Sequence, residues 1–126
     1  MRILFSVIIA ALLQSPAAPK KGGNPEAATI KNPVAASAES TAAGKRVYTR
    51  MCSRCHGAEG KGDGTAASAP VPDLTDDKWD YGASDGEIFA VIHDGVSTDM
   101  DGYAARLSDT DIWNVVNFVR SVAAKR

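Results

Sequence analysis

The residues of this chain whose types and spacing could do chemistry stand together in the run Cys52-Ser53-Arg54-Cys55-His56. Two thiols separated by two residues can form thioether bonds to the two vinyl groups of one porphyrin, and the adjacent histidine can then ligate the iron. The chain contains two cysteines in all. The run therefore predicts a covalently attached haem that uses both of them.

Two other chemistries share part of this pattern. A pair of cysteines at this spacing also occurs in dithiol redox proteins and in zinc sites. A thioredoxin-like dithiol needs a surrounding βαβ pattern, which the sequence does not show. A zinc site needs four ligands, and the candidates are Cys52, Cys55, His56 and the distant His93. Haem attachment is the leading interpretation, with these two as its alternatives.

The N-terminus has the features of a secretory signal peptide. Arg2 supplies a positive charge, residues 3–13 are almost all apolar, and small residues precede a cleavage site after Ala17. The apolar run is shorter than the roughly 20 residues that span a membrane. We expect residues 1–17 to be removed and the protein to be exported, to the periplasm or another extracytoplasmic compartment. Covalent haem attachment also takes place outside the cytoplasm, so the two predictions support each other.

Composition divides the rest of the chain into a tether and one domain. Residues 18–41 are rich in Ala, Pro, Lys, Ser and Asn and hold almost no large apolar side chain, so we expect them to be disordered. Residues 42–126 are few for a self-sufficient core, and a buried haem would add apolar mass. The formal net charge of −1 gives no reason to expect a nucleic-acid partner.

Three helices can be placed from periodicity and end signals. The first is predicted over residues 42–51 and delivers the cysteines at its C-terminal end. The second begins with a capping box of Ser84 and Glu87 and stops at Gly95. The third follows Ser108 as N-cap and carries an apolar stripe over its length. No segment alternates as a strand, which indicates an all-α fold.

The methionines narrow the choice of a ligand on the opposite side of the iron. Met1 leaves with the signal peptide, and Met51 abuts Cys52, where it would point away from the far face. Met100 lies in a loop between the second and third helices that could cross that face. His93 is the rival, although a histidine near a helix C-terminus also suits the negative end of the helix dipole. We expect Met100 to be the sixth ligand.

The order and spacing of these elements resemble the class I cytochrome c family over residues 44–121. The matching elements are, in chain order, Gly44-x-x-x-Tyr48, Cys52-x-x-Cys55-His56-Gly57, Gly60-x-Gly62-Asp63-Gly64, Pro72-Asp73-Leu74, Trp79-x-Tyr81-Gly82, the Met100 loop and Leu107-Ser108-Asp109. The resemblance implies a small cytochrome c fold of three to five helices wrapped around one covalently bound haem c. It also implies that His56 and Met100 ligate the iron.

Further roles follow from the same resemblance. The carbonyl of Pro72 would accept a hydrogen bond from the other ring nitrogen of His56, which fixes the orientation of the imidazole and raises its basicity. Leu74 would pack on the haem. Trp79 and Tyr81 would lie near the haem edge or its propionates. These four residues complete the predicted cofactor site.

Two more features concern the helix crossing and the Met100 loop. The resemblance implies that Gly44 permits the first and last helices to cross closely, with Tyr48 against Phe118. It also implies a proline directly after the distal methionine, where this chain has Asp101. Aspartate would leave the loop looser than proline, and its negative charge would favour ferric iron.

The predicted function is one-electron transfer between exported redox proteins. Two protein ligands on the iron leave no open position for a small-molecule substrate, and the sequence shows no separate catalytic constellation, so we expect an electron carrier and not an enzyme. The partners would be a redox donor and acceptor, with a membrane-associated oxidase or dehydrogenase as one possibility. The alternative is a small peroxidase-like haem enzyme or gas-binding sensor, which would require Met100 to be off the iron.

Overall fold

The computed structural model describes residues 18–97 and 99–123, so the predicted signal peptide lies outside the described residues. Within these ranges the elements are, in chain order, α1 (Pro25–Ala28), α2 (Ala38–Met51), α3 (Ser53–His56), α4 (Asp85–Asp94), β1 (Gly95–Ser97), β2 (Met100–Asp101) and α5 (Asp109–Ala123). The prediction of a small helical fold is confirmed. The two short strands are an addition that the sequence pattern did not indicate.

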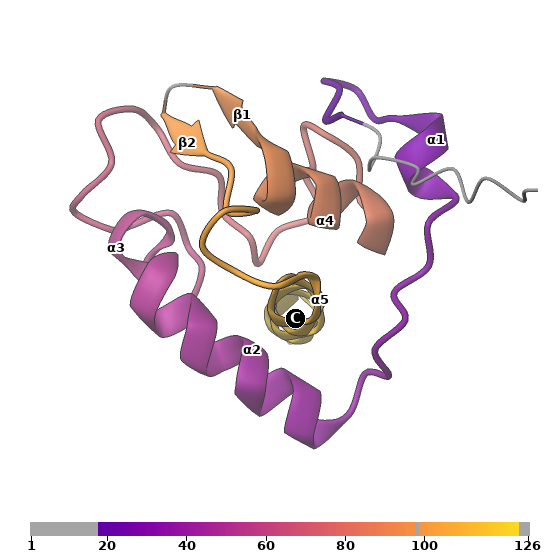
Figure 1. Cartoon of the computed structure of the whole chain (residues 1–126). Helices are drawn as coiled ribbons and strands as arrows, with labels where there is room; N and C mark the ends of the chain where they lie inside the picture. The colour runs from indigo at the N-terminus through magenta and orange to yellow at the C-terminus, as the bar shows by residue number, and fades with distance from the viewer. Residues whose placement is uncertain (1–17, 98, 124–126) are drawn as a thin grey trace, which may run out of the picture.

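Helices α2 and α5 cross at close range, and α4 lies on the other side of α5 (Figure 1). A side chain at Gly44 would collide with the backbone of Asn114 and come within 3.0 Å of the Cβ atom of Phe118. The rings of Tyr48 and Phe118 pack beside this point, with centroids 4.9 Å apart. The structure therefore shows the glycine-dependent crossing that the family resemblance implied.

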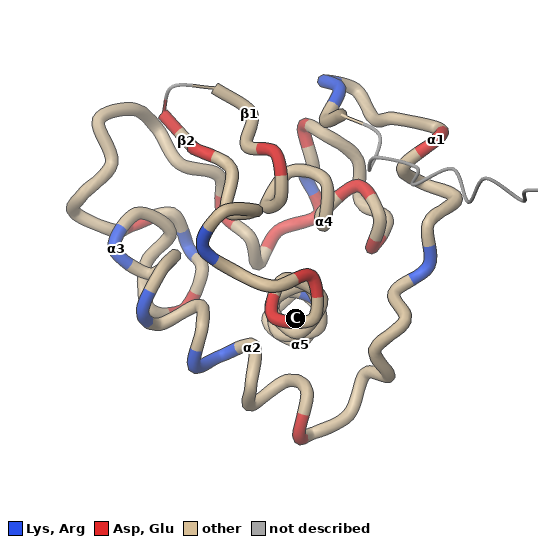
Figure 2. Tube along the Cα trace, viewed as in Figure 1, with Lys and Arg blue, Asp and Glu red and all other residues tan. Residues whose placement is uncertain are grey.

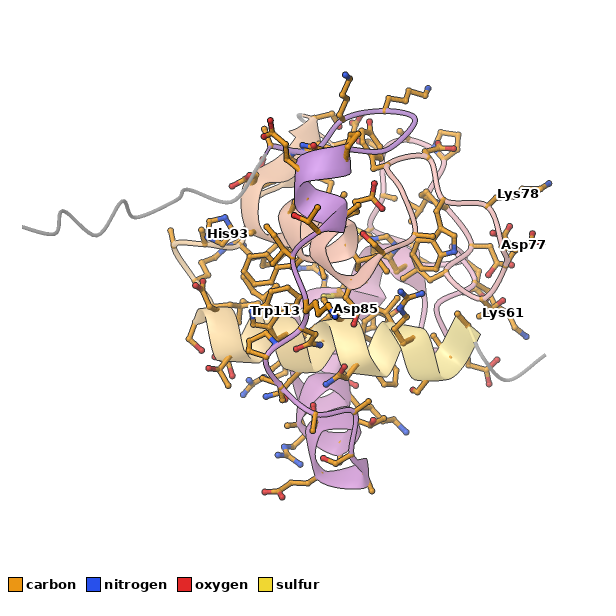
Figure 3. All side chains as sticks on the ribbon, turned by 90° about the vertical axis from the view of Figure 1, so that its right-hand side faces the viewer. Lys61, Asp77, Lys78, Asp85, His93 and Trp113 are labelled. Carbon is orange, nitrogen blue, oxygen red and sulfur yellow. The ribbon has the colours of Figure 1, made fainter. Side chains whose placement is uncertain are left out.

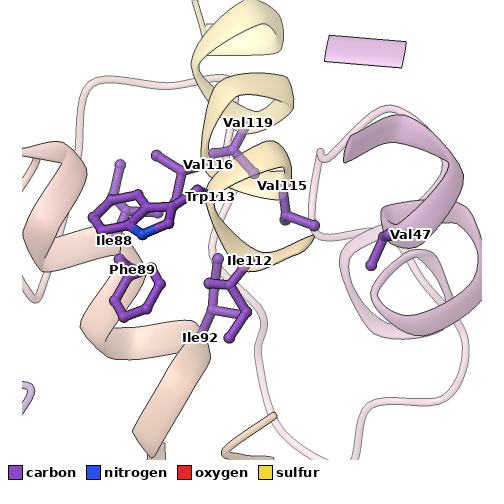
Figure 4. Close-up of a cluster of buried hydrophobic side chains, with 9 residues drawn as sticks. All are labelled: Val47, Ile88, Phe89, Ile92, Ile112, Trp113, Val115, Val116 and Val119. Atoms are coloured by element: carbon purple, nitrogen blue, oxygen red, sulfur yellow. The ribbon is translucent and has the colours of Figure 1, made fainter. Parts of the chain in front are cut away.

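The hydrophobic core lies mainly between α4 and α5 (Figure 4). Its buried members are Val47, Ile88, Phe89, Ile92, Ile112, Trp113, Val115, Val116 and Val119. The rings of Phe89 and Trp113 stack with centroids 4.1 Å apart. The spacing of Ile112, Val115 and Val119 places them on one side of α5, as their helical periodicity predicted. The core thereby fixes α4 against the helix that also packs on α2.

Side chains cap the two helices that frame the site. At α4 the Ser84 hydroxyl accepts from the Glu87 N–H at 3.2 Å, and the Glu87 carboxylate accepts from the Ser84 N–H at 3.0 Å. This is the predicted capping box. Helix α2 begins earlier than predicted, with Ser37 as its N-cap. Ser40 is buried inside the helix, where its hydroxyl donates to the Asn114 side chain at 2.6 Å.

The structure differs from the expectation that residues 18–41 form a disordered tether. This segment contains α1 and the start of α2, and it contacts α4 and α5 through hydrogen bonds. The Asn24 N–H donates to Glu87 at 2.8 Å, and the Asn117 amide donates to the Val34 carbonyl at 3.2 Å. The segment is ordered by bonds to buried polar side chains, by the burial of Ala27 and by the packing of Ile30 and Val34 on the core. The amino-acid composition of a segment does not reveal hydrogen bonds to residues far away in the sequence.

Strands β1 and β2 form a short antiparallel pair, and Met100 is the first residue of β2. Gly95 lies opposite Asp101 and Ser97 lies opposite Met100. The segments hold three and two residues, which is too short for a period-two pattern to be recognised in the sequence. The pairing gives the Met100 loop a defined base at the end of α4.

Candidate functional site

One turn of helix presents both cysteines and the histidine. Helix α2 ends at Met51, and α3 continues from Ser53 to His56 after a single residue. The His56 N–H donates to the Cys52 carbonyl at 3.0 Å, which closes this turn. Residues three apart on a helix share a face, so Cys52 and Cys55 lie side by side. Both are free thiols.

A cavity of about 440 Å³ lies beside this turn. Its size is typical of a site for a small molecule or cofactor. All of the site residues predicted from the sequence line it, namely Cys52, Cys55, His56, Pro72, Leu74, Trp79, Tyr81 and Met100. These residues come from α3 and the residue before it, from the long loop between α3 and α4, and from β2. The fold therefore brings together groups as far apart in the sequence as Cys52 and Met100.

The His56 ring has the protonation state and the burial expected of a metal ligand. Burial lowers the pKa of His56, and the backbone of Pro72 opposes this by raising it. The neutral imidazole that burial favours is the form that ligates metals. Its Nδ1 atom is buried and has no hydrogen-bond partner in the described part of the chain, so the predicted bond from this atom to the Pro72 carbonyl is not formed, although buried polar atoms are normally partnered. The ring nitrogens, the thiols and the cavity fit a haem.

The first cysteine is a weak acid before any attachment. Burial raises the pKa of the Cys52 thiol to about 11, and the neighbouring Cys55 adds to this effect. At neutral pH the thiol is therefore protonated, and a thiolate, the form that attacks disulfides and binds zinc, is disfavoured. The local environment suits a covalent thioether better than a reactive dithiol.

The glycine-rich loop after His56 folds closely against α3 and the Pro72 segment. A Cβ atom at Gly64 would collide with the Cys55 carbonyl, and one at Gly62 would lie 3.1 Å from the Pro72 carbonyl oxygen. The Tyr48 hydroxyl donates to the carbonyl of Gly57 at 2.6 Å. These contacts hold the loop against α3 and the Pro72 segment, whose residues His56 and Pro72 line the cavity.

Tyr103 anchors the Met100 loop and was not among the predicted site residues. Its hydroxyl donates to the Met51 carbonyl at 3.0 Å, beside the first cysteine. Its N–H donates to the Ile92 carbonyl at 2.9 Å, and the guanidinium of Arg106 lies 4.3 Å from its ring centroid. Met51, Tyr103 and Arg106 all line the cavity. The aromatic residue that ends the Met100 loop was the available sequence signal for this anchor.

His93 does not line the cavity. Its Nδ1 atom lies 2.7 Å from a carboxylate oxygen of Asp94, and its ring stacks on Phe89. Figure 3 shows it near Trp113, at the end of α5 opposite to Lys61. Among residues 18–97 and 99–123, no three His, Cys, Asp or Glu side chains group in a way that could hold a metal ion. The zinc alternative therefore lacks a ligand set.

Charge is divided between two parts of the molecule (Figure 2). Lys45, Arg46, Arg50 and Arg54 are exposed along α2 and α3. Carboxylates are concentrated in the loop before α4, on α4 and around β2. A surface divided in this way can steer a charged partner at distances within the Debye length, about 8–10 Å at physiological salt.

A small helical fold with two thiols, an imidazole and a thioether sulfur around one cavity defines a c-type cytochrome. Comparison with known proteins gives the particular family. Residues 39–119 match the family described as cytochrome c oxidase, cbb3-type, subunit III. The chain belongs to this family. Membership implies covalently bound haem c and a role in electron transfer.

Individual relatives are similar in sequence or in structure. The cbb3-type oxidase subunit CcoP of Rubrivivax gelatinosus is 31% identical over 100 residues, which cover 79% of this chain and 30% of that protein. The subunit FixP of Azorhizobium caulinodans is 34% identical over 90 residues, which cover 65% of this chain and 29% of that protein. The chain thus spans less than a third of the length of these relatives.

Two solved cytochromes share the fold. Cytochrome c6 of the diatom Phaeodactylum tricornutum has a TM-score of 0.54 and 26% identity, over 66% of this chain and 93% of its own. Cytochrome cL of Hyphomicrobium denitrificans has a TM-score of 0.60 and 26% identity, over 72% of this chain and 51% of its own. The all-α cytochrome c fold predicted from the sequence is confirmed.

Proposed function

We propose that this chain is an exported mono-haem c-type cytochrome that carries single electrons between redox proteins. Haem would be attached at Cys52 and Cys55, with His56 and Met100 as the axial ligands. The observation that supports this most strongly is the meeting of all four side chains at one cavity.

Each residue of the site has a physical task in this proposal. The bound haem supplies an iron that alternates between ferrous and ferric states. His56 is kept neutral by burial and so can ligate, with the Pro72 backbone beside it to orient the ring. Leu74, Trp79 and Tyr81 line the cavity and exclude water from the porphyrin. With His56 and Met100 holding the iron, no position would be left for a small-molecule substrate, so the bound haem would serve electron transfer.

Proposed partners and location come from the relatives and from the N-terminus. The relatives are named as subunits of cbb3-type cytochrome c oxidases, and we propose redox proteins as donor and acceptor, with a membrane-associated oxidase as one partner. Neither nucleic acid nor a small-molecule substrate is proposed. In residues 18–97 and 99–123 the structure has no helix with the length and apolar character to span a bilayer. Export to the periplasm is proposed from the features of residues 1–17.

The axial ligands are tested with two methionine variants of the purified haem protein. Oxidised wild type should show the sulfur-to-iron charge-transfer band, and the reduced protein should not change its spectrum under carbon monoxide. Met100→Ala should lose the band and bind carbon monoxide. Met51→Leu is the matched control, because Met51 also lines the cavity but its contact to Tyr103 uses the backbone carbonyl.

The outcomes separate electron transfer from the alternative. If wild type binds carbon monoxide as readily as Met100→Ala, the sixth position is open and a peroxidase-like enzyme or gas sensor is favoured. If Met51→Leu alone loses the band, the ligand assignment is wrong. Haem that stays with the chain after denaturation, and is lost in a Cys52→Ser, Cys55→Ser double variant, tests the covalent attachment.

A further inference from the structure

The Glu87 carboxylate has more partners than a capping box requires. Its side chain belongs to a residue that is only 8% exposed. In a capping box this carboxylate accepts from the N-cap N–H alone. Here it also accepts from the Ser84 hydroxyl at 2.7 Å and from the N–H of Asn24, 63 positions earlier in the sequence, at 2.8 Å. Glu87 therefore joins the N-terminal segment to the start of α4.

The same carboxylate lies against a loop that lines the haem cavity. Trp79, Asp80, Tyr81 and Gly82 are consecutive cavity-lining residues. A Cβ atom at Gly82 would collide with the carboxylate of Glu87, and the φ of Gly82 is +92°. Only glycine fits this conformation and this contact. The turn that carries both aromatic side chains is thus packed directly onto Glu87.

The N-terminal segment holds this loop from a second side. The Gly22 N–H donates to the Asp80 carbonyl at 2.7 Å. Two residues later, Asn24 makes its bond to Glu87. The Trp79–Gly82 turn is therefore held between Gly22 and Glu87, and both contacts depend on the position of the N-terminal segment.

The other end of this segment is fixed on α5. The Asn32 amide donates to the Asn117 side chain at 2.8 Å and to the Trp113 carbonyl at 3.3 Å. Asn117 is 5% exposed and donates in turn to the Val34 carbonyl at 3.2 Å. Between the two ends Ala27 is fully buried, and its carbonyl lies against Gly86 of α4. Residues 18–37, which we call the strap, are therefore attached at both ends.

We propose that the strap, acting through Glu87, positions the Trp79–Gly82 turn against the haem and keeps water from that edge of the porphyrin. Glu87 and Asn32 are positioning residues in this scheme, since neither lines the cavity. The inference rests on the proposed haem site. Its physical consequence concerns the reduction potential, because solvent at the haem edge stabilises the more highly charged ferric state.

Asn32→Ala tests the strap without changing any charge. It removes the amide bonds on α5 and lies at the end of the strap away from Gly22. Backbone amide exchange of residues 79–84 should accelerate by about threefold to tenfold, the effect of losing one or two hydrogen bonds, and the reduction potential should fall. Thr29→Ala is the matched control, because its hydroxyl bonds only to the Glu26 carbonyl within the strap. It should leave both measurements unchanged.

Glu87→Gln is a second variant. Only its amide exchange is informative, because the loss of the carboxylate charge would by itself change the reduction potential. It should also accelerate exchange of residues 79–84. The inference would be overturned if Asn32→Ala accelerated amide exchange in the strap but changed neither the exchange of residues 79–84 nor the reduction potential. Wild-type protein without covalent haem would instead refute the proposed function, and the exchange comparison would still test the strap.

Discussion

Gly44→Ala tests whether the close crossing of α2 and α5 holds the domain together. Alanine is the better helix former, and in an exposed helix the change would stabilise by about 1 kcal/mol. Gly44 is buried, however, and faces α5. The added methyl group would lie 2.5 Å from the carbonyl carbon of Asn114 and 3.0 Å from the Cβ atom of Phe118.

The expected cost follows from these distances. Non-bonded carbon atoms rest about 3.5–4.0 Å apart, so α2 and α5 must separate by about 1 Å. Atom pairs that move apart by this much lose about a quarter to a half of their attraction, and the Tyr48–Phe118 pair lies at the same crossing. Overpacking of this kind costs about 3 kcal/mol at the upper end of its usual range. After the gain in helix propensity, we expect a net loss of about 2 kcal/mol.

Guanidinium unfolding of the haem protein, followed by circular dichroism and by haem absorbance, measures this loss. Ala42→Gly is the matched control, because Ala42 is exposed on the same helix and reports propensity alone. The control should cost about 1 kcal/mol. If Gly44→Ala is as stable as wild type, the helices do not need glycine at the crossing and the reasoning fails.

Burial raises the pKa of the Tyr48 phenol, so the folded state favours its neutral form and the free energy of unfolding should fall as pH rises above about 10. Tyr48→Phe should lessen this alkaline decline, to which the raised pKa of the half-buried Tyr103 also contributes, while costing about 1 kcal/mol at pH 7 through loss of the bond to Gly57; a titration of unfolding free energy in which both proteins decline alike would contradict this. Asp101→Asn removes a negative charge one residue from the proposed iron ligand and should raise the reduction potential by on the order of 20 mV, less at high salt, and a redox titration that shows a fall would refute it. Ser84→Ala should destabilise the protein by about 1–2 kcal/mol, and a loss below about 0.3 kcal/mol in the same unfolding assay would mean that the capping box contributes little.

The sequence predicts well those features that depend on residues close together in the chain. The Cys52–His56 run, the Ser84 capping box and the apolar stripe of α5 each depend on spacing within one or two turns. Once the helices pack, the Cys52–His56 run and Val115 and Val119 of α5 line the same cavity. The strap was predicted wrongly as disordered because its bonds join Asn24 to Glu87 and Asn32 to Asn117 across more than 60 positions, and composition carries no trace of such pairs.

In the Met100 loop, hydrogen bonds take the place of the backbone restriction that a proline would impose. The family resemblance implies proline after the distal methionine, and Asp101 in its place predicted a looser loop. In the structure Asp101 lies in β2, opposite Gly95 of β1. Three residues after Met100, the Tyr103 hydroxyl bonds to the Met51 carbonyl at 3.0 Å.

The strand pair joins the segments before and after Met100, and the Tyr103 bond ties the segment after Met100 to the end of α2, next to Cys52. A proline at position 101 would fix φ but would also remove an N–H from the strand pair. The proline restriction and the strand pairing therefore exclude each other at this position. Asp101→Asn therefore changes only the charge, whereas Asp101→Pro changes the charge and the strand pairing at the same time. Tyr103→Phe, which removes only the bond to Met51, should weaken the charge-transfer band of the proposed iron–sulfur bond more than Asp101→Asn does. The reverse order would show that the strand pair alone holds the loop.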